Sequence, residues 1–298
     1  MVPKSIKFSI IIVSYNRKSY LKDTIMYCMT QTINDFEIIV VDASEKELLL
    51  EDDFIYSLNG KINYIVWPEI GNISRQRNIG LKKAQGEYIL FLDDDVKFEA
   101  DLLDQITQRF IQLGADALSG IIEASHREIS KKVHITNDPM LYLGQPSFHQ
   151  NDFLVQTYLV SAACFAVKRK VILSIGGFDE QVQGVFDDSD VGIRLTNHGY
   201  LVYHDNMFSV YHYAARNSGS RSPRLGPIWK YANICYLQIK HFYKNNPDDF
   251  FDKSIRYFLK PSRLYLNPIK LFKEILLFKK GFDEAQRRIL EGPKNINL

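Results

Sequence analysis

The stretch YILFLDDDVKFEADLLDQ, Tyr88 to Gln105, contains the clearest buried strand of the sequence, and three aspartates follow that strand directly. Residues 88–92 are mostly apolar, and a short continuous apolar run is typical of a parallel-sheet strand with both faces covered. The residues after the aspartates have the pattern of a helix. We therefore expect a buried strand that brings Asp93, Asp94 and Asp95 to one point.

Similar apolar runs occur on the N-terminal side of this stretch, and segments with helical spacing separate them. The runs are KFSIIIVS at 7–14, FEIIVVD at 36–42 and INYIVW at 62–67. Apolar residues recur at three and four positions in 18–32 and in 74–86, and the second segment ends at a glycine. This alternation predicts an α/β fold with a doubly wound, mostly parallel sheet flanked by helices.

The composition is that of an ordinary globular protein, because 298 residues with 46% hydrophobic content can bury a large core. The cysteines Cys28, Cys164 and Cys235 are far apart, which excludes a zinc or disulfide framework and favours a reducing compartment. The N-terminus lacks the apolar region of a signal peptide, and no apolar run approaches the ~18 residues of a membrane span. We expect a cytoplasmic protein, either free or held peripherally at the inner face of a membrane.

The second half of the chain has fewer clear signals. A strand is expected at 115–124, and a polar stretch with little periodicity follows at 125–153. A connection of this length is typical of a functional loop or lid. Order returns with a GGFDE turn at 176–180 and a helix at 187–199, DDSDVGIRLTNHG, which ends at its last glycine.

Polar residues follow three of the predicted strands, at 14–17, 42–44 and 93–95. Ligands of open α/β sheets bind beyond the carboxyl ends of the strands, so these residues should share one site. Alternation along an extended strand places Asp93 and Asp95 on the same side, where two carboxylates repel unless a cation lies between them. Mg²⁺ or Mn²⁺ is the natural partner, and it typically links carboxylates to phosphate oxygens. The alternative is that the three aspartates form a solvated turn or a helix cap.

Five segments of the chain resemble, in order, the signature segments of the inverting GT-A glycosyltransferases of family two. The resemblance covers roughly residues 7–216. It implies a GT-A fold, a nucleotide-diphosphate-sugar donor, a D-x-D metal site and an acidic general base at the start of the second-half helix. The segments are FSIIIVSYNR (8–17), FEIIVVDAS (36–44), GNISRQRNIGLKKAQGEYILFLDDDV (71–96), GGFDE (176–180) and DDSDVGIRLTNHG followed by VYHY (187–199 and 210–213).

The resemblance also implies a role for individual residues. Ser14, Tyr15 and Arg17 look like the first nucleotide-contacting loop, and Asp42 looks like the acid that holds the base. The pair ahead of the D-x-D is Arg77 and Asn78. Asp93 would approach the ribose, Asp94 belongs to the donor-binding set, and Asp95 and His212 would bind the metal ion.

Each of these assignments has a simpler alternative. Tyr15 and Arg17 could be ordinary loop residues, and Asp42 could cap a helix. Arg77 could decorate a helix face, and His212 could be a structural histidine of a strand. The chain also departs from its relatives, since many of them have a second acid at the position of Ala43 and a glutamate at the position of Asp187.

The acidic helix can be interpreted from its own spacing. Asp190 and Arg194 are four residues apart and can form an ion pair, so Asp190 is expected to be structural. Asp188 lies on the stripe of Val191 and Leu195, and an acid on the apolar side of a helix usually serves a cleft, where partial burial raises its pKa. We therefore predict that Asp188 is the general base, with a helix-capping role as the alternative. In the GGFDE turn, Asp179 or Glu180 is expected to contact acceptor hydroxyls.

The resemblance implies a catalytic domain at 1–216, with a nucleotide-sugar half at about 1–124 and an acceptor half at about 125–216. Residues 217–298 are predicted to form a basic helical extension. Within it, residues 228–298 carry 14 Lys and Arg against 7 Asp and Glu, a net charge of +7. Its aromatic, aliphatic and lysine-rich segments at 228–244 and 268–282 suit interfacial helices attracted to anionic lipid. Alternatively, these helices pack on the catalytic domain or form an oligomer contact.

The predicted activity is metal-dependent transfer of a sugar from a UDP- or dTDP-sugar to a glycan or lipid-linked glycan, with inversion and in bacterial polysaccharide or glycan assembly. We expect no nucleic-acid partner. One alternative is a catalytically silent nucleotide-sugar-binding protein of the same fold. Another is a Mg²⁺-dependent phosphoacceptor domain, which predicts a chain of about 120 residues without a second acidic helix.

Overall fold

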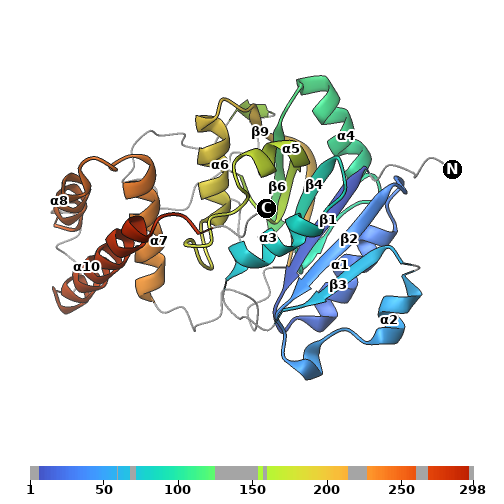
Figure 1. Cartoon of the computed structure of the whole chain (residues 1–298), viewed down its shortest axis with the longest axis horizontal. Helices are drawn as coiled ribbons and strands as arrows, with labels where there is room; N and C mark the ends of the chain where they lie inside the picture. The colour runs from blue at the N-terminus through green and yellow to red at the C-terminus, as the bar shows by residue number, and fades with distance from the viewer. Residues whose placement is uncertain are drawn as a thin grey trace.

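The computed structural model of the protein describes residues 7–58, 60–67, 72–124, 154–156, 160–213, 227–259 and 268–294. Figure 1 shows a large sheet with helices on both faces, and a group of C-terminal helices that lies to one side of it. The predicted lid at 125–153 lies outside the described residues.

The N-terminal half of the sheet is parallel, as the sequence predicts. Its strands lie in the order β3-β2-β1-β4, and each pair in this row is parallel. The elements are β1 (Phe8–Ser14), α1 (Lys18–Met29), β2 (Phe36–Asp42), η1 (Lys46–Leu48), α2 (Asp52–Ser57), β3 (Ile62–Val66), α3 (Ile73–Lys83) and β4 (Tyr88–Asp93).

The second half of the sheet mixes strand directions. From β4 the order continues as β8-β6-β9-β5, with β7 also paired to β9, and β8 is antiparallel to both of its neighbours. The sequence does not reveal this reversal, because a fully buried strand such as CFAVK is continuously apolar in either direction. The elements are β5 (Val96–Lys97), α4 (Leu102–Leu113), β6 (Ala117–Ala124), β7 (Leu154–Gln156), β8 (Cys164–Lys168), α5 (Arg169–Ser174), α6 (Asp187–Asn197) and β9 (Val202–His212).

Two apolar layers cover the sheet, and β1 contributes to both because its side chains alternate. Ile10 and Ile12 pack in the layer that includes α1 and α4. Ile11 packs in the opposite layer with residues of α3, α5 and α6. The second layer therefore anchors α3 and α6, the two helices that carry Arg77 and Asp188.

The helical extension has an apolar core of its own. The described helices of the extension are α7 (Pro227–His241), α8 (Pro247–Phe258) and α10 (Pro268–Glu291), and Tyr236, Phe250, Phe278 and Phe282 lie buried among them. The apolar side of α7 is thus covered by protein, which favours the packing explanation for this helix. Among the described residues, no helix combines the length and the apolar character needed to cross a bilayer.

Candidate active site

The carboxyl ends of β1, β2 and β4 meet at one edge of the sheet. Ser14 is level with Asp42 on the neighbouring strand, and Val13 is level with Asp93 on the other side. The polar segments that follow these strands therefore lie together, at the position where ligands bind in open α/β sheets.

Asp93, Asp95 and His212 form a group that could hold a metal ion, since one ligand atom from each residue lies within 4.8 Å of the others. Pairing of β5 with β9 sets Val96 level with His212 and brings the histidine to the aspartates. His212 Nε2 lies 2.8 Å from Asp95 Oδ1 and 3.5 Å from Asp93 Oδ2. Two carboxylates and an imidazole fit Mn²⁺ or Mg²⁺ and leave room in the coordination shell for phosphate oxygens.

Asp94 points away from this group and binds the first loop instead. Ser14 Oγ donates to Asp94 Oδ2 at 2.8 Å, and Arg17 Nη1 lies 3.0 Å from Asp94 Oδ1 and 3.1 Å from Asp95 Oδ2. Burial and the nearby Asp95 raise the pKa of Asp94 to about 7, while Arg17 and Ser14 oppose this shift. Asp94 and Ser14 therefore fix Arg17 beside the metal group.

Asp42 is buried and organises the loop that follows β2. Its Oδ1 accepts from the backbone N–H of Ser44 at 2.9 Å, and its Oδ2 accepts from the Tyr64 hydroxyl at 2.6 Å. The first bond is an Asx turn, and no helix begins at Asp42, so the capping alternative is wrong. Ser44 Oγ also accepts from the backbone N–H of Asn16, which joins this loop to the one that carries Tyr15, a buried residue.

Arg77 connects the aspartates after β4 to the acidic helix. Its guanidinium is ion-paired with Asp187 through Nη1, and its Nη2 lies 3.4 Å from Asp93 Oδ1. The neighbouring Asn78 is 0% exposed, and its amide is bound by Phe178 and Glu180 of the GGFDE turn. The structure thus places Asn78 in the protein interior, where its amide fixes α3 to the GGFDE turn.

Asp188 lies at the start of α6, next to the residue that pairs with Arg77. Phe186, just before this helix, has the left-handed φ of 71°, a conformation in which a non-glycine residue is strained. Asp188 Oδ1 accepts from the N–H of Ser189 at 2.8 Å, and Oδ2 lies 3.4 Å from the N–H of Ala162. Burial and repulsion by Asp187 raise the pKa of Asp188 to about 6, with Arg77 opposing.

The remaining acids of this region are bound by cations of the protein. Asp190 forms the predicted ion pair with Arg194, with a separation of 2.7 Å. Asp179 and Glu180, which were expected to contact acceptor hydroxyls, bind protein groups in the structure: Asp179 binds Lys240 and Tyr236, and Glu180 binds Arg75 and Asn78. Sequence reasoning missed these contacts because the partners lie at least 57 residues from Asp179 and 102 from Glu180 along the chain.

Residues 9–176 match the family model described as Glycosyl transferase family 2, which is more than half of the chain. The chain belongs to glycosyl transferase family 2. This confirms the family that the sequence segments indicate. Relatives from this family whose names give a sugar and an acceptor can therefore be compared with the chain.

Two curated relatives illustrate the range of similarity. An uncharacterized glycosyltransferase of Haemophilus influenzae is 26% identical over 191 residues, which are 63% of this chain and 61% of the relative. The GalNAc(5)-diNAcBac-PP-undecaprenol beta-1,3-glucosyltransferase of Campylobacter jejuni is 25% identical over 291 residues, 92% of this chain and 87% of the relative. The chain thus spans less than two thirds of the first relative and most of the second.

The crystal structure of GalNAc-T7 with UDP, GalNAc and Mn²⁺ shares the fold. The two structures superpose with a TM-score of 0.63 at 16% sequence identity, over 97% of this chain and 57% of the other. At this identity the likeness concerns the fold alone. The predicted GT-A type α/β fold is confirmed.

Proposed function

We propose that the protein transfers a sugar from a nucleotide-diphosphate donor to an acceptor hydroxyl with inversion, in bacterial polysaccharide or glycan assembly. One observation carries this proposal: Arg77 contacts both Asp93 of the metal group and Asp187, the neighbour of Asp188. A site for a donor diphosphate and a carboxylate with a raised pKa are therefore held together by one buried cation. Family membership supports the same reaction class.

Asp93, Asp95 and His212 would hold Mn²⁺ or Mg²⁺. When bound there, the ion would neutralise the charge that builds on the departing diphosphate. The presence of UDP and Mn²⁺ together in the GalNAc-T7 structure supports this proposal. Arg17, fixed by Asp94 and Asp95, adds a second cation for the phosphates.

The donor is proposed to be a UDP- or dTDP-sugar, held by the loops after β1 and β2. Tyr15 and Asp42 would lie beside the base, and Asp93 beside the ribose. Asp42 already accepts two hydrogen bonds from protein groups, but a carboxylate has about four acceptor positions, so it can accept another from a base N–H.

Asp188 is proposed to remove the proton from the attacking acceptor hydroxyl. A carboxylate whose pKa is raised to about 6 is a stronger base than an ordinary aspartate and is still ionised at neutral pH. Asp187 is occupied by Arg77, so Asp188 is the better proton acceptor of the two. The single displacement that results inverts the anomeric centre.

The acceptor is proposed to be a glycan or a lipid-linked glycan. The C. jejuni relative, which aligns with 92% of this chain, is named for an acceptor linked to PP-undecaprenol. A lipid-linked acceptor would place the enzyme at a membrane surface, and we propose peripheral contact through the helical extension. Ile269, Phe272 and Leu276 of α10 are exposed there, with the exposed Lys273 beside them.

A screen of UDP- and dTDP-sugars with Mn²⁺ tests this function, with thermal stabilisation and nucleotide release as readouts. We expect one donor both to raise the melting temperature and to be hydrolysed slowly in the absence of acceptor. Binding without any hydrolysis or transfer would favour the silent nucleotide-sugar-binding protein. No response to any UDP- or dTDP-sugar would contradict both functions for these donors.

The Asp95→Asn variant tests the metal group. We expect it to lose Mn²⁺-dependent donor binding while the protein stays folded, because an amide oxygen lacks the negative charge of the carboxylate and is a much weaker ligand for a divalent ion. Calorimetry with and without EDTA measures this, and Asp53→Asn, on the exposed side of α2, is the matched control. Donor binding and turnover that persist undiminished in EDTA would exclude a metal role for Asp95.

A further inference from the structure

We propose that Lys240, in the helical extension, is a positioning residue for the reaction and holds the acidic helix α6 in the geometry that Asp188 requires. This inference rests on the proposed function. It concerns a residue outside the segments that resemble the family and outside the matched range, 9–176.

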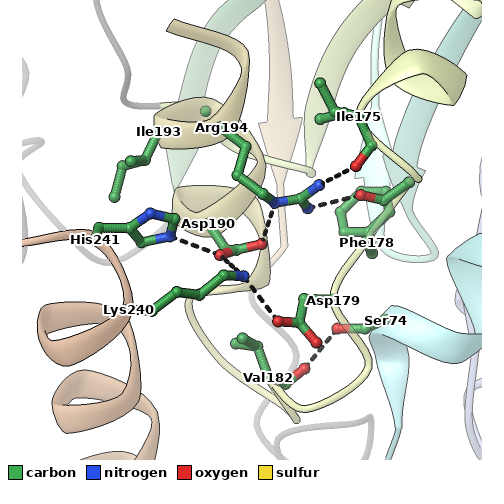
Figure 2. A network of polar contacts seen from close by, with 12 residues as sticks. Ser74, Ile175, Phe178, Asp179, Val182, Asp190, Ile193, Arg194, Lys240 and His241 are labelled. Atoms are coloured by element: carbon green, nitrogen blue, oxygen red, sulfur yellow. Dashed lines mark hydrogen bonds and ion pairs between the residues drawn. The ribbon is translucent and has the colours of Figure 1, made fainter. Parts of the chain in front are cut away.

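Lys240 joins two buried carboxylates from different segments. Its Nζ lies 2.7 Å from Asp179 Oδ2, in the GGFDE turn, and 2.7 Å from Asp190 Oδ1, in α6. Asp179 is 1% exposed and Asp190 is 0% exposed. Figure 2 shows the ammonium group of Lys240 between the two carboxylates, with α7 approaching α6 from the side of the extension.

The same acids are tied to the rest of the site. Asp190 also binds Arg194 Nε at 2.7 Å and His241 Nε2 at 2.8 Å. Arg194 then donates to the carbonyls of Ile175 and Gly177, at the start of the turn. The turn, α6 and α7 therefore form one polar network, and Asp190 is only two residues from Asp188.

The other end of the turn is bound to α3. Glu180 Oε2 accepts from Arg75 Nε at 2.8 Å, and Glu180 Oε1 accepts from Asn78 Nδ2 at 3.0 Å. Arg77, between these two residues, binds Asp93 and Asp187. The GGFDE turn thus lies between the helix that carries Arg77 and the helix that carries Asp188, and Lys240 fixes it to the second.

Loss of the Lys240 charge would affect the two acids unequally. Asp190 would keep Arg194 and His241. Asp179 would keep the Tyr236 hydroxyl and backbone N–H groups, but among the described residues Lys240 is the only cation in ion-pair contact with it. Two buried carboxylates would then face each other without the ion between them, and they should separate or take up a proton.

Separation of the turn from α6 would shift Asp188 relative to the donor. A misplacement of about 1 Å in a catalytic group costs on the order of 100-fold in rate. The donor itself is proposed to bind at the ends of β1, β2 and β4, on residues that Lys240 does not touch. Loss of Lys240 should therefore lower kcat and leave donor affinity unchanged.

The variant Lys240→Met tests this inference, with Lys244→Met, at an exposed position just beyond α7, as the matched control. We expect kcat to fall roughly 10- to 100-fold in Lys240→Met, while the donor Kd by calorimetry stays within about twofold of the wild-type value. Lys244→Met should match the wild type in both. A purely structural lysine would lower the melting temperature and leave the kcat of the folded protein unchanged, which would overturn the proposal.

The double variant Asp179→Asn/Lys240→Met covers the case in which the single variant does not fold. It removes both charges of the Lys240–Asp179 pair, so Asp179 is not left as a buried carboxylate without a cation, and Asp190 keeps Arg194 and His241. The Lys240 link between Asp179 of the turn and Asp190 of α6 is nevertheless absent. We expect this variant to fold and to keep the reduced kcat, and a kcat within about twofold of the wild-type value would overturn the inference. If the wild-type protein transfers no sugar, the proposed function fails instead, and the two failures are thus distinguishable.

Discussion

Asp187 and Asp188 are adjacent in the chain and have different environments. The Asp187 carboxylate forms an ion pair with the Arg77 guanidinium. Asp188 contacts backbone N–H groups, and burial together with the neighbouring Asp187 raises its pKa to about 6. An acid held in an ion pair beside an acid with a raised pKa indicates different roles, and we propose a structural role for Asp187 and proton transfer for Asp188.

The Asp188→Asn variant tests this division. Asparagine keeps the size of the side chain but cannot accept the proton, so we expect transfer to fall about 10²- to 10⁴-fold. Donor affinity should persist, because the donor is proposed to bind to the metal group and the β1 loop. Product analysis and calorimetry on the same preparation measure the two quantities. Transfer at the wild-type rate would place the base elsewhere, with Asp187 or Asp190 next in order.

The pH dependence of kcat should reflect the same carboxyl group. As the proposed general base, Asp188 would be active only when ionised, and burial raises its pKa to about 6, so kcat should fall as the pH drops below about 6, by up to tenfold per unit. Because the pKa in the folded state lies above the usual carboxyl range, ionised Asp188 destabilises the fold at neutral pH. Asp188→Asn should therefore also raise the melting temperature at pH 7, and a lower value would contradict this reading of its environment.

Side-chain contacts that depend on local spacing could be predicted from the sequence. The Asp190–Arg194 ion pair follows from a separation of four residues. Asp93 and Asp95 lie close together as strand alternation predicts, although β4 ends at Asp93 and a turn, not an extended strand, brings Asp95 there. The environment of Asn78 could not be predicted, since its partner Phe178 is 100 residues away. The same is true of Asp179, which looks like a free turn residue until α7 places Lys240 against it.

At the scale of elements, the parallel strands and their helices were predictable, because continuous apolar runs alternate along the chain with segments of helical period. The position and direction of β8 were not, because an apolar run carries no information about which strands it pairs with. The antiparallel β8 nevertheless matters for the site. It lies between β4 and β6, and residues just before it include Ala162, whose N–H lies 3.4 Å from Asp188.

Two helices of the extension touch closely at Gly281. A Cβ atom at this position would lie 2.6 Å from Tyr231 Cβ and 2.8 Å from the backbone nitrogen of Ala232. The glycine in α10 therefore allows the backbone of α7 to approach. Because α7 carries Lys240, this contact helps to set the helix that reaches the acidic residues of α6.

At the scale of the whole molecule, the extension has two sides with different properties. One side of α7 reaches α6 through Lys240 and His241. The first half of α10 instead presents Ile269, Phe272 and Leu276 to solvent, at a spacing of three and four residues that puts them on one helix face. The extension could thus both complete the catalytic site and orient it towards a surface.

Flotation with vesicles tests this orientation. We expect the wild-type protein to float with anionic vesicles at low salt, because three exposed apolar side chains can enter the interface while lysines of α10 contribute about 1 kcal/mol each near anionic lipid. Neutral vesicles and high salt should weaken binding, since salt screens the attraction. Phe272→Glu should reduce the bound fraction by roughly tenfold or more. The exposed ring that would enter the membrane interface is replaced by a charge that anionic lipid repels.

The control for this variant is Ile111→Glu in α4, outside the extension, where the isoleucine is 74% exposed. It introduces the same charge on a different part of the molecule and should leave flotation unchanged. If both variants weaken binding equally, the change in net charge explains the loss and the contact face is wrong. If the wild-type protein stays at the bottom of the gradient at low salt, the extension does not bind membranes, and its role is confined to packing against the catalytic domain.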